Sequence, residues 1–439
     1  MTPVRPRRFR LHWLVLIPVG MLVLCHAAGW VALASVARDA ALFVPRTQSA
    51  ILLALAIVVG RAAAAPRSLR RRITVLVIVA AAFAFIAVPL PRQVAGNSIM
   101  PGGSDISSTR ETFEDRFAVA AGRVSFHSHL GDVVMVAIDR VLGASDTTPA
   151  RAYAVLSRLA GLLFLLELLV AGAWHRWSRR VCRYAALCLA APVSLLFFGY
   201  WELGYLSLSA GAVPLLALGR RRPSLGTQAS QLVAGGLQGL HTALHGFGML
   251  GVAGGALAAL TGGRTLGQRL MNAATFTAAS VALYLGWIFL YVTLGELSLT
   301  WSRELGSRPW LETTIIDRRF AAPLLSAAGF AEFGFFSALA GVPLLALALA
   351  TVRPALVLPA AAFGVPSLLF LFRWWPVSAP FNLDLLLVVF PGVLAACWAL
   401  ASSRRQSMLG IGTLGLLHVL LWSALGSALF DRVWVGGAP

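Results

Sequence analysis

The chain has 439 residues, of which 58% are hydrophobic and 12% are charged, and its formal net charge is +19. A soluble domain of this length needs more charged residues to cover its surface, so the composition argues against one and predicts a membrane protein. All 36 basic residues are arginine. This charge suits anionic membrane lipids as partners and requires no nucleic acid.

Stretches of about 20 largely apolar residues, the length that crosses a bilayer, recur along the whole chain. Segment 228–260 is apolar but too long for one span and is broken by glycines, which predicts two short helices meeting near the outer side, or a re-entrant pair. The predicted fold class is all-α: a polytopic helix bundle with about 11–13 spans. The other predicted spans are 11–36, 48–65, 73–91, 152–174, 181–199, 201–218, 272–295, 326–350, 355–372, 381–401 and 408–430.

The predicted spans and the polar stretches between them divide the chain into four parts. Residues 1–72 form N-terminal membrane helices with basic cytoplasmic flanks. Residues 73–295 form a membrane core that includes a large outer loop, 92–151, with surface helices. A second outer loop covers 296–325, and residues 326–439 form the C-terminal membrane helices.

The arginines indicate how these helices are oriented. Seven segments carry 21 arginines and no acidic residue, whereas the opposite loops carry 14 arginines against 13 acids. Positively charged residues next to spans stay on the cytoplasmic side, which predicts a multi-pass plasma-membrane protein with a cytoplasmic N-terminus. The seven segments are 1–10, 61–72, 175–183, 219–227, 261–269, 351–354 and 402–407.

This orientation places most other polar side chains at the outer boundary. Ionisable groups at membrane depth cost a few kcal/mol each, so they mark candidate sites. Glu167 lies deeper, and we expect it to be buried against a partner in the bundle. The candidate substrate-binding residues on the outer side are His127, His129, Asp132, Glu202, His241, His245, Arg373, Trp374, Trp375 and Asp384.

Each of these candidates also has a purely structural interpretation. His241 and His245 share a helix face at a spacing suitable for two metal ligands, or they form hydrogen bonds with neighbours. His127 and His129 are either ligands or interfacial anchors. Trp374 and Trp375 are either belt residues at the membrane surface or a platform that stacks on a sugar. No metal site is predicted from these residues.

Several common motifs are absent. There is no P-loop, no G-x-G-x-x-G before a helix, no G-x-S-x-G and no H-E-x-x-H. The sequence therefore gives no support for nucleotide-driven transport or for several common classes of hydrolase. Paired halves with matching broken helices are not evident either, which weakens a secondary-transporter interpretation.

The stretch from Asp105 to Leu169 resembles the start of a GT-C-type integral membrane glycosyltransferase. The corresponding text is Gly103-Ser-Asp105, then Phe117–Arg123, His127–Leu130 and Val141–Gly143, and finally Ala150-Arg151 leading into Leu156–Gly161. The chain departs from the family pattern because two helices precede the one that leads into the loop, whereas the acidic loop usually follows the first helix.

The resemblance implies an enzyme that moves a sugar, mannose or arabinofuranose, from a polyprenyl-phosphate carrier to an envelope glycan, lipid or protein on the outer face. A carboxylate would deprotonate the acceptor, with Asp105 expected as the base and Glu114 and Asp115 as its rivals. Arg373 would contact the lipid phosphate. The lipid-linked sugar is the donor substrate, and no cofactor is implied. The alternatives are a lipid or solute transporter or flippase, and a non-catalytic cell-envelope assembly subunit.

Overall fold

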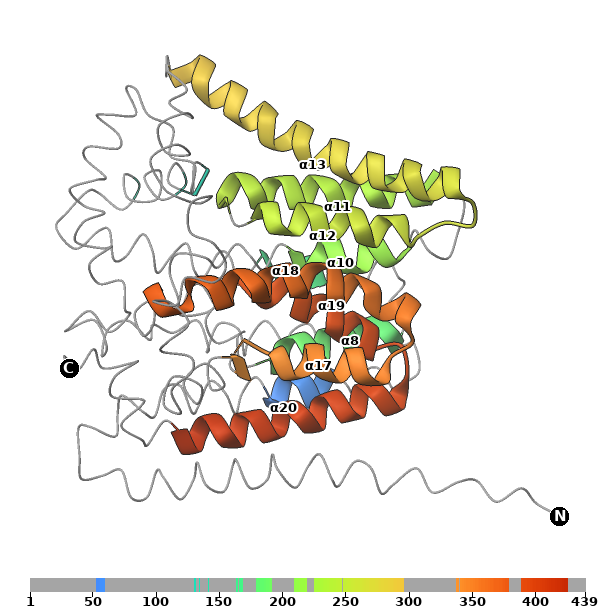
Figure 1. The fold of residues 1–439 in the computed structure, drawn as a ribbon, viewed down its shortest axis with the longest axis vertical. Coiled ribbons are helices and arrows are strands. Elements are labelled where there is room, and N and C mark those ends of the chain that lie inside the picture. The colour runs from blue at the N-terminus through green and yellow to red at the C-terminus, as the bar shows by residue number, and fades with distance from the viewer. Residues whose placement is uncertain are drawn as a thin grey trace.

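A computed structural model describes the helical centre of the chain (Figure 1). Every regular element among the described residues is helical, and none of these residues lies in a β-strand. The all-α class is therefore confirmed for this part of the protein. The described residues are 53–59, 179–191, 209–218, 225–246, 248–295, 340–378 and 388–424, together with 130, 131, 134, 141, 163, 164, 166–168, 337 and 338.

Nine longer helices within the described ranges form a bundle with α13 at one side and α20 at the other (Figure 1). In between, α11 and α12 pack under α13, α10 contacts α11, and α18 and α19 pack together, while α8 and α17 lie beside α20. The helices are α8 (Arg179–Ala190), α10 (Ser209–Leu218), α11 (Leu225–Leu244), α12 (Gly248–Leu260), α13 (Leu266–Gly295), α17 (Val342–Thr351), α18 (Pro354–Ser378), α19 (Phe390–Leu400) and α20 (Arg404–Ala424).

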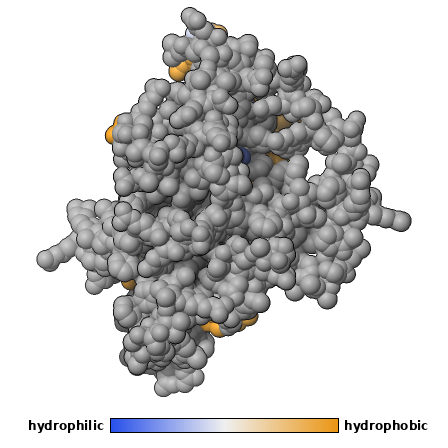
Figure 2. All heavy atoms as spheres, turned by 90° about the vertical axis from the view of Figure 1, so that its left-hand side faces the viewer, coloured by the Kyte–Doolittle hydropathy of each residue, from blue (hydrophilic) through white to orange (hydrophobic). Residues whose placement is uncertain are grey.

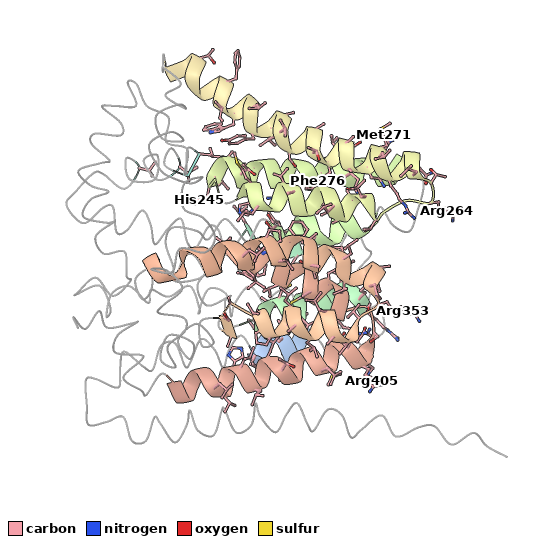
Figure 3. All side chains as sticks on the ribbon, in the orientation of Figure 1. His245, Arg264, Met271, Phe276, Arg353 and Arg405 are labelled. Atoms are coloured by element: carbon pink, nitrogen blue, oxygen red, sulfur yellow. The ribbon has the colours of Figure 1, made fainter. Side chains whose placement is uncertain are left out.

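Three arginine-bearing turns lie at the same end of this bundle. Arg264 is in the turn between α12 and α13, Arg353 is between α17 and α18, and Arg405 is at the start of α20 (Figure 3). His245, which follows α11, lies toward the opposite end (Figure 3). Three of the seven segments that the arginine pattern assigns to the cytoplasmic side, 261–269, 351–354 and 402–407, therefore have their arginines at the same end of the bundle.

Two helices start at the arginine end with similar hydrogen bonds. At α13, Gln268 N donates to Thr265 Oγ1 and Arg264 N donates to Gln268 Oε1. At α20, Gln406 N donates to Ser403 Oγ. A hydroxyl residue followed three positions later by glutamine satisfies amides that a helix start leaves unpaired. The pattern fixes where both helices begin.

Glycines allow the helices of this bundle to approach closely. A Cβ on Gly235 of α11 would collide with the Phe276 carbonyl of α13, and one on Gly255 of α12 would collide with the Phe276 ring. Ser280 Oγ of α13 also donates to Gly235 O at 3.0 Å. Gly235 and Gly239, like Gly251 and Gly255, have the G-x-x-x-G spacing that packs helices in membranes.

The structure refines the predicted helix boundaries. Segment 228–260 does form two helices, α11 ending at Leu244 and α12 beginning at Gly248, with Gly246 in the turn after α11. Other glycines of the segment, such as Gly235 and Gly255, are inside helices and pack against neighbours. The predicted break within this segment is therefore confirmed, with Gly246 in its turn. The predicted span 326–350 is interrupted at Gly341, whose φ of 84° is in the left-handed region that side chains disfavour.

One helix among the described residues, at Leu266–Leu290 in α13, is long and apolar enough to cross a membrane. Shorter apolar helices are α12, α17, α19 and the Pro354–Leu369 part of α18. Large apolar side chains remain exposed on several helices, among them Leu266 (71%) and Phe289 (70%) on α13. Figure 2, which views the end opposite the arginine turns, shows visible hydrophobic side chains mainly at the margins. The predicted number of about 11–13 spans stays a prediction.

Candidate functional site

A row of polar side chains is buried along one face of α11. Gln231 and Gln238 are two helical turns apart and therefore share a face, and His241 and His245 continue the row toward the end of the helix. All four are buried, Gln231, Gln238 and His241 completely. Polar groups are costly to bury in an otherwise apolar helix, so this row is the first candidate for a functional site.

His241 is held by two neighbours at its Nδ1 atom. Ser209 Oγ of α10 lies 2.9 Å from Nδ1, and Gln238 Nε2 lies 3.3 Å from it. Gln238 Nε2 also donates to Gly248 O of α12 at 2.8 Å. An amide nitrogen only donates hydrogen bonds, so Nδ1 is the acceptor and the ring proton is on Nε2. The histidine thus links α10, α11 and α12.

Several polar atoms of the row have no hydrogen-bond partner among the described residues. These are His241 Nε2, Gln238 Oε1 and both amide atoms of Gln231. Together they offer donors and acceptors but no charge, because the proton on His241 Nε2 leaves that ring neutral. This chemistry matches hydroxyl groups, which both donate and accept.

A second part of the buried polar network converges on the beginning of α10. The Tyr184 hydroxyl of α8 donates to Ala210 O at 2.8 Å, and Gly211 N donates to Glu167 Oε2 at 3.3 Å. The Cβ and Cγ atoms of Glu167 also pack against Gly211. Three successive residues, 209 to 211, therefore contact His241, Tyr184 and Glu167 in turn. Glu167 is the only acidic residue in the described part of the chain.

Glu167 is buried, as expected from the sequence, and its Oε1 atom has no hydrogen-bond partner within the described structure. A carboxyl group held by one backbone amide retains a large desolvation cost. We did not predict Glu167 as a site residue. Its signal was present, because it is an ionisable residue inside an otherwise apolar predicted span, 152–174.

The interpretation of His241 as a residue that bonds its neighbours is confirmed by Ser209 and Gln238. His245 lies just after the end of α11, and its N–H donates to His241 O at 3.0 Å. The described residues contain no group of three His, Cys, Asp or Glu side chains that could hold a metal ion.

The structure also places the backbone of three other predicted residues. Arg373, Trp374 and Trp375 lie inside α18, which continues to Ser378, instead of in a loop after it. The apolar pattern predicts that this helix ends at residue 372, whereas α18 continues for about another turn and a half. The remaining predicted residues, Asp105, Glu114, Asp115, His127, His129, Asp132, Glu202 and Asp384, lie outside the described residues.

Sequence reasoning missed Ser209, Gln231 and Gln238. The two glutamines could have been found from their spacing, because positions 231, 238, 241 and 245 fall on one face of a helix. Ser209 gives no such signal, since a serine in a predicted span usually bonds its own helix. Only the packing of α10 against α11 brings it to His241.

Comparison of the chain with protein-family models, with curated protein sequences and with solved structures finds no match.

Proposed function

We propose that this chain is a multi-pass plasma-membrane glycosyltransferase, with its arginine turns in the cytoplasm and its reaction on the outer face. It would move mannose or arabinofuranose from a polyprenyl-phosphate carrier to a cell-envelope acceptor. The proposal combines the GT-C-like pattern of residues 105–169 with the direction of the described helices.

Membrane insertion is supported by two features of the described bundle. Its helices pack through glycines at G-x-x-x-G spacing, an arrangement that suits lipid because close backbone contact replaces hydrophobic driving force. Its outer helices also leave large apolar side chains exposed, including Phe289 of α13 and Leu416 of α20. In water these faces would be an aggregation liability, whereas lipid covers them at no cost.

The single observation that best supports a site on one side of the membrane is the end of the bundle at which α13 ends. The α13 helix runs from the turn of Arg264 to Gly295 at the opposite end, where the acid-bearing segment 296–325 begins (Figures 1 and 3). The α18 helix likewise starts beside Arg353 and carries Arg373 away from the arginine end. The acid-bearing segment 296–325 thus begins at the end of the bundle opposite the arginine turns, which is what an enzyme with outward chemistry requires.

The proposed reaction divides its tasks between residue types. A carboxylate of the outer loop, Asp105 first and Glu114 or Asp115 next, takes the proton from the acceptor hydroxyl. An arginine stabilises the leaving phosphate through paired N–H donors, and Arg373 is our first choice. The neutral polar row of α11 has the chemistry to hold hydroxyl groups.

A transfer assay on purified protein in lipid tests this proposal. Labelled polyprenyl-phosphate mannose, arabinofuranose and glucose are offered to wild type, Asp105→Asn and Asp115→Asn. Consumption of one donor by wild type, lost in one variant that still folds, supports the enzyme and identifies the base. If no donor is consumed and none raises the thermal stability of the protein, the glycosyltransferase proposal fails.

One observation favours transport of a lipid or solute as a second candidate function. The polar row of α11 extends from His245 at the outer end back to Gln231, less than two turns from the start of the helix. A transporter needs polar groups that continue through the bundle, and α11 supplies them over much of its length. Uptake of labelled sugar or polyprenyl phosphate into liposomes, abolished by Gln231→Leu without loss of folding, would favour this function over transfer.

A further inference from the structure

Four arginines of α8 and α20 form a patch at the arginine end of the bundle: Arg179, Arg183, Arg404 and Arg405. The two helices pack against each other, and Arg183 lies within electrostatic range of both Arg179 and Arg404. Arg183 is half-buried and the other three are exposed. We call this group the α8–α20 patch.

The guanidinium groups of the patch make no hydrogen bond or ion pair with any other described residue. Two other arginines behave differently: Arg180 of α8 lies 4.3 Å over the Trp398 ring and donates to Trp398 O, and Arg269 Nε of α13 donates to Gly263 O at 3.1 Å. Those two have a structural role in the bundle. Four like charges held together with no acid beside them in the described structure repel one another, which an anion would relieve.

The surface next to the patch is apolar and elongated. Starting from Arg405, one face of α20 continues through Leu409, Leu416 and Leu420, which are 44%, 60% and 53% exposed. This face is about 22 Å long at the rise of an α-helix. That length exceeds the roughly 15 Å of hydrocarbon in one leaflet. Gly412, between Leu409 and Leu416, has open space where a side chain would be.

We propose that the α8–α20 patch binds the phosphate of an anionic phospholipid, with the lipid's acyl chains lying along the Leu409–Leu420 face of α20. Arginine is suited to this role because its planar fork donates two parallel hydrogen bonds to phosphate oxygens. The amides at the start of α20 add partial positive charge at the same place. A soluble phosphate would use the arginines but would gain nothing from the apolar face, so the combination favours a lipid.

This inference rests on the membrane placement proposed above but not on the glycosyltransferase reaction, because the patch is at the opposite end from Gly295, where the acid-bearing segment 296–325 begins. Full-length protein in a neutral detergent is titrated with phosphatidylglycerol, phosphatidylcholine and inorganic phosphate, with no sugar donor present. Bound lipid is counted by native mass spectrometry, and the unfolding temperature is followed in parallel.

Wild type should retain phosphatidylglycerol and be stabilised by it, with much weaker effects of the other two. Arg404→Gln should lower the apparent affinity about tenfold, because one charge-assisted contact is lost, and Arg404→Lys should recover only part of it. Arg264→Gln is the matched control, because Arg264 is also exposed but lies in the α12–α13 turn, and this variant should bind like wild type. Arg179→Gln provides a second patch variant should Arg404→Gln fail to fold.

Equal binding of phosphatidylglycerol and phosphatidylcholine would overturn the proposal, as would equal losses in Arg404→Gln and Arg264→Gln. Inorganic phosphate that binds as well as the lipid would show that the patch takes a soluble anion instead. A protein that binds phosphatidylglycerol through Arg404 yet transfers no sugar would support the lipid site and contradict the proposed reaction, so the two failures are distinguishable.

Discussion

Ser209 of α10 and His241 of α11 are joined by a buried contact of 2.9 Å between Oγ and Nδ1. These residues are 32 positions apart, and the contact connects the two parts of the polar network, one around Glu167 and Tyr184 and the other along α11. It therefore couples the position of α10 to His241. Among the described histidines, His241 is the only one whose ring is fully buried and whose Nε2 atom has no hydrogen-bond partner.

Ser209→Ala should destabilise the protein by about 1 kcal/mol, because His241 Nδ1 then keeps only the longer contact from Gln238. Ser367→Ala is the matched control: Ser367 is also buried, but its hydroxyl bonds Phe363 O within its own helix, so its loss should cost less. Thermal unfolding in detergent measures both. A smaller effect of Ser209→Ala than of Ser367→Ala would contradict a linking role for the serine.

Gln231→Leu should stabilise the protein by about 1–3 kcal/mol, because both amide atoms of Gln231 are buried without a partner in the described structure. Gln238→Leu should have the opposite sign, since Gly248 O and His241 Nδ1 would lose their donor. Unfolding midpoints of the two variants provide the comparison. Destabilisation by Gln231→Leu would indicate that this amide has a partner in the native protein.

Gly235→Ala should destabilise the bundle by about 1–3 kcal/mol, because the new methyl group collides with the Phe276 backbone and forces α11 and α13 apart. Gly286→Ala in α13 is the control, since nothing lies within 4 Å of its added Cβ. That substitution should instead stabilise by about 0.5–1 kcal/mol through the better helix propensity of alanine. Unfolding measurements that rank the two variants equally would rule out the close α11–α13 contact.

Single cysteines at positions 264, 353 and 405 should all react with a membrane-impermeant thiol reagent from the cytoplasmic side only. The reason is that the three arginine turns share one end of the bundle (Figure 3) and that arginines near spans remain in the cytoplasm. The experiment uses a chain whose native cysteines are replaced, with Ser307→Cys in segment 296–325 as the expected outer control. Labelling of the three positions from different sides would disprove the common orientation.

The amino-acid sequence by itself determined the helical class of the described part, the presence of two helices within 228–260, and the common end of the three arginine segments 261–269, 351–354 and 402–407. These follow from apolar length and charge, which are local properties of the chain. Glu167 was likewise expected to be buried, because an ionisable residue inside an apolar span has no other low-cost environment in a bundle. The proposed catalytic loop stays a prediction.

Only the tertiary structure decided which polar residues meet. Ser209, Gln238 and His241 lie together because α10, α11 and α12 pack around one another, and no local pattern encodes that arrangement. The same holds for Gly235 and Gly255, which lie inside helices against Phe276. Whether a glycine inside a helix destabilises the protein depends on whether a neighbouring helix packs closely against it. That contact is decided by the tertiary structure and not by the residues beside the glycine in the chain.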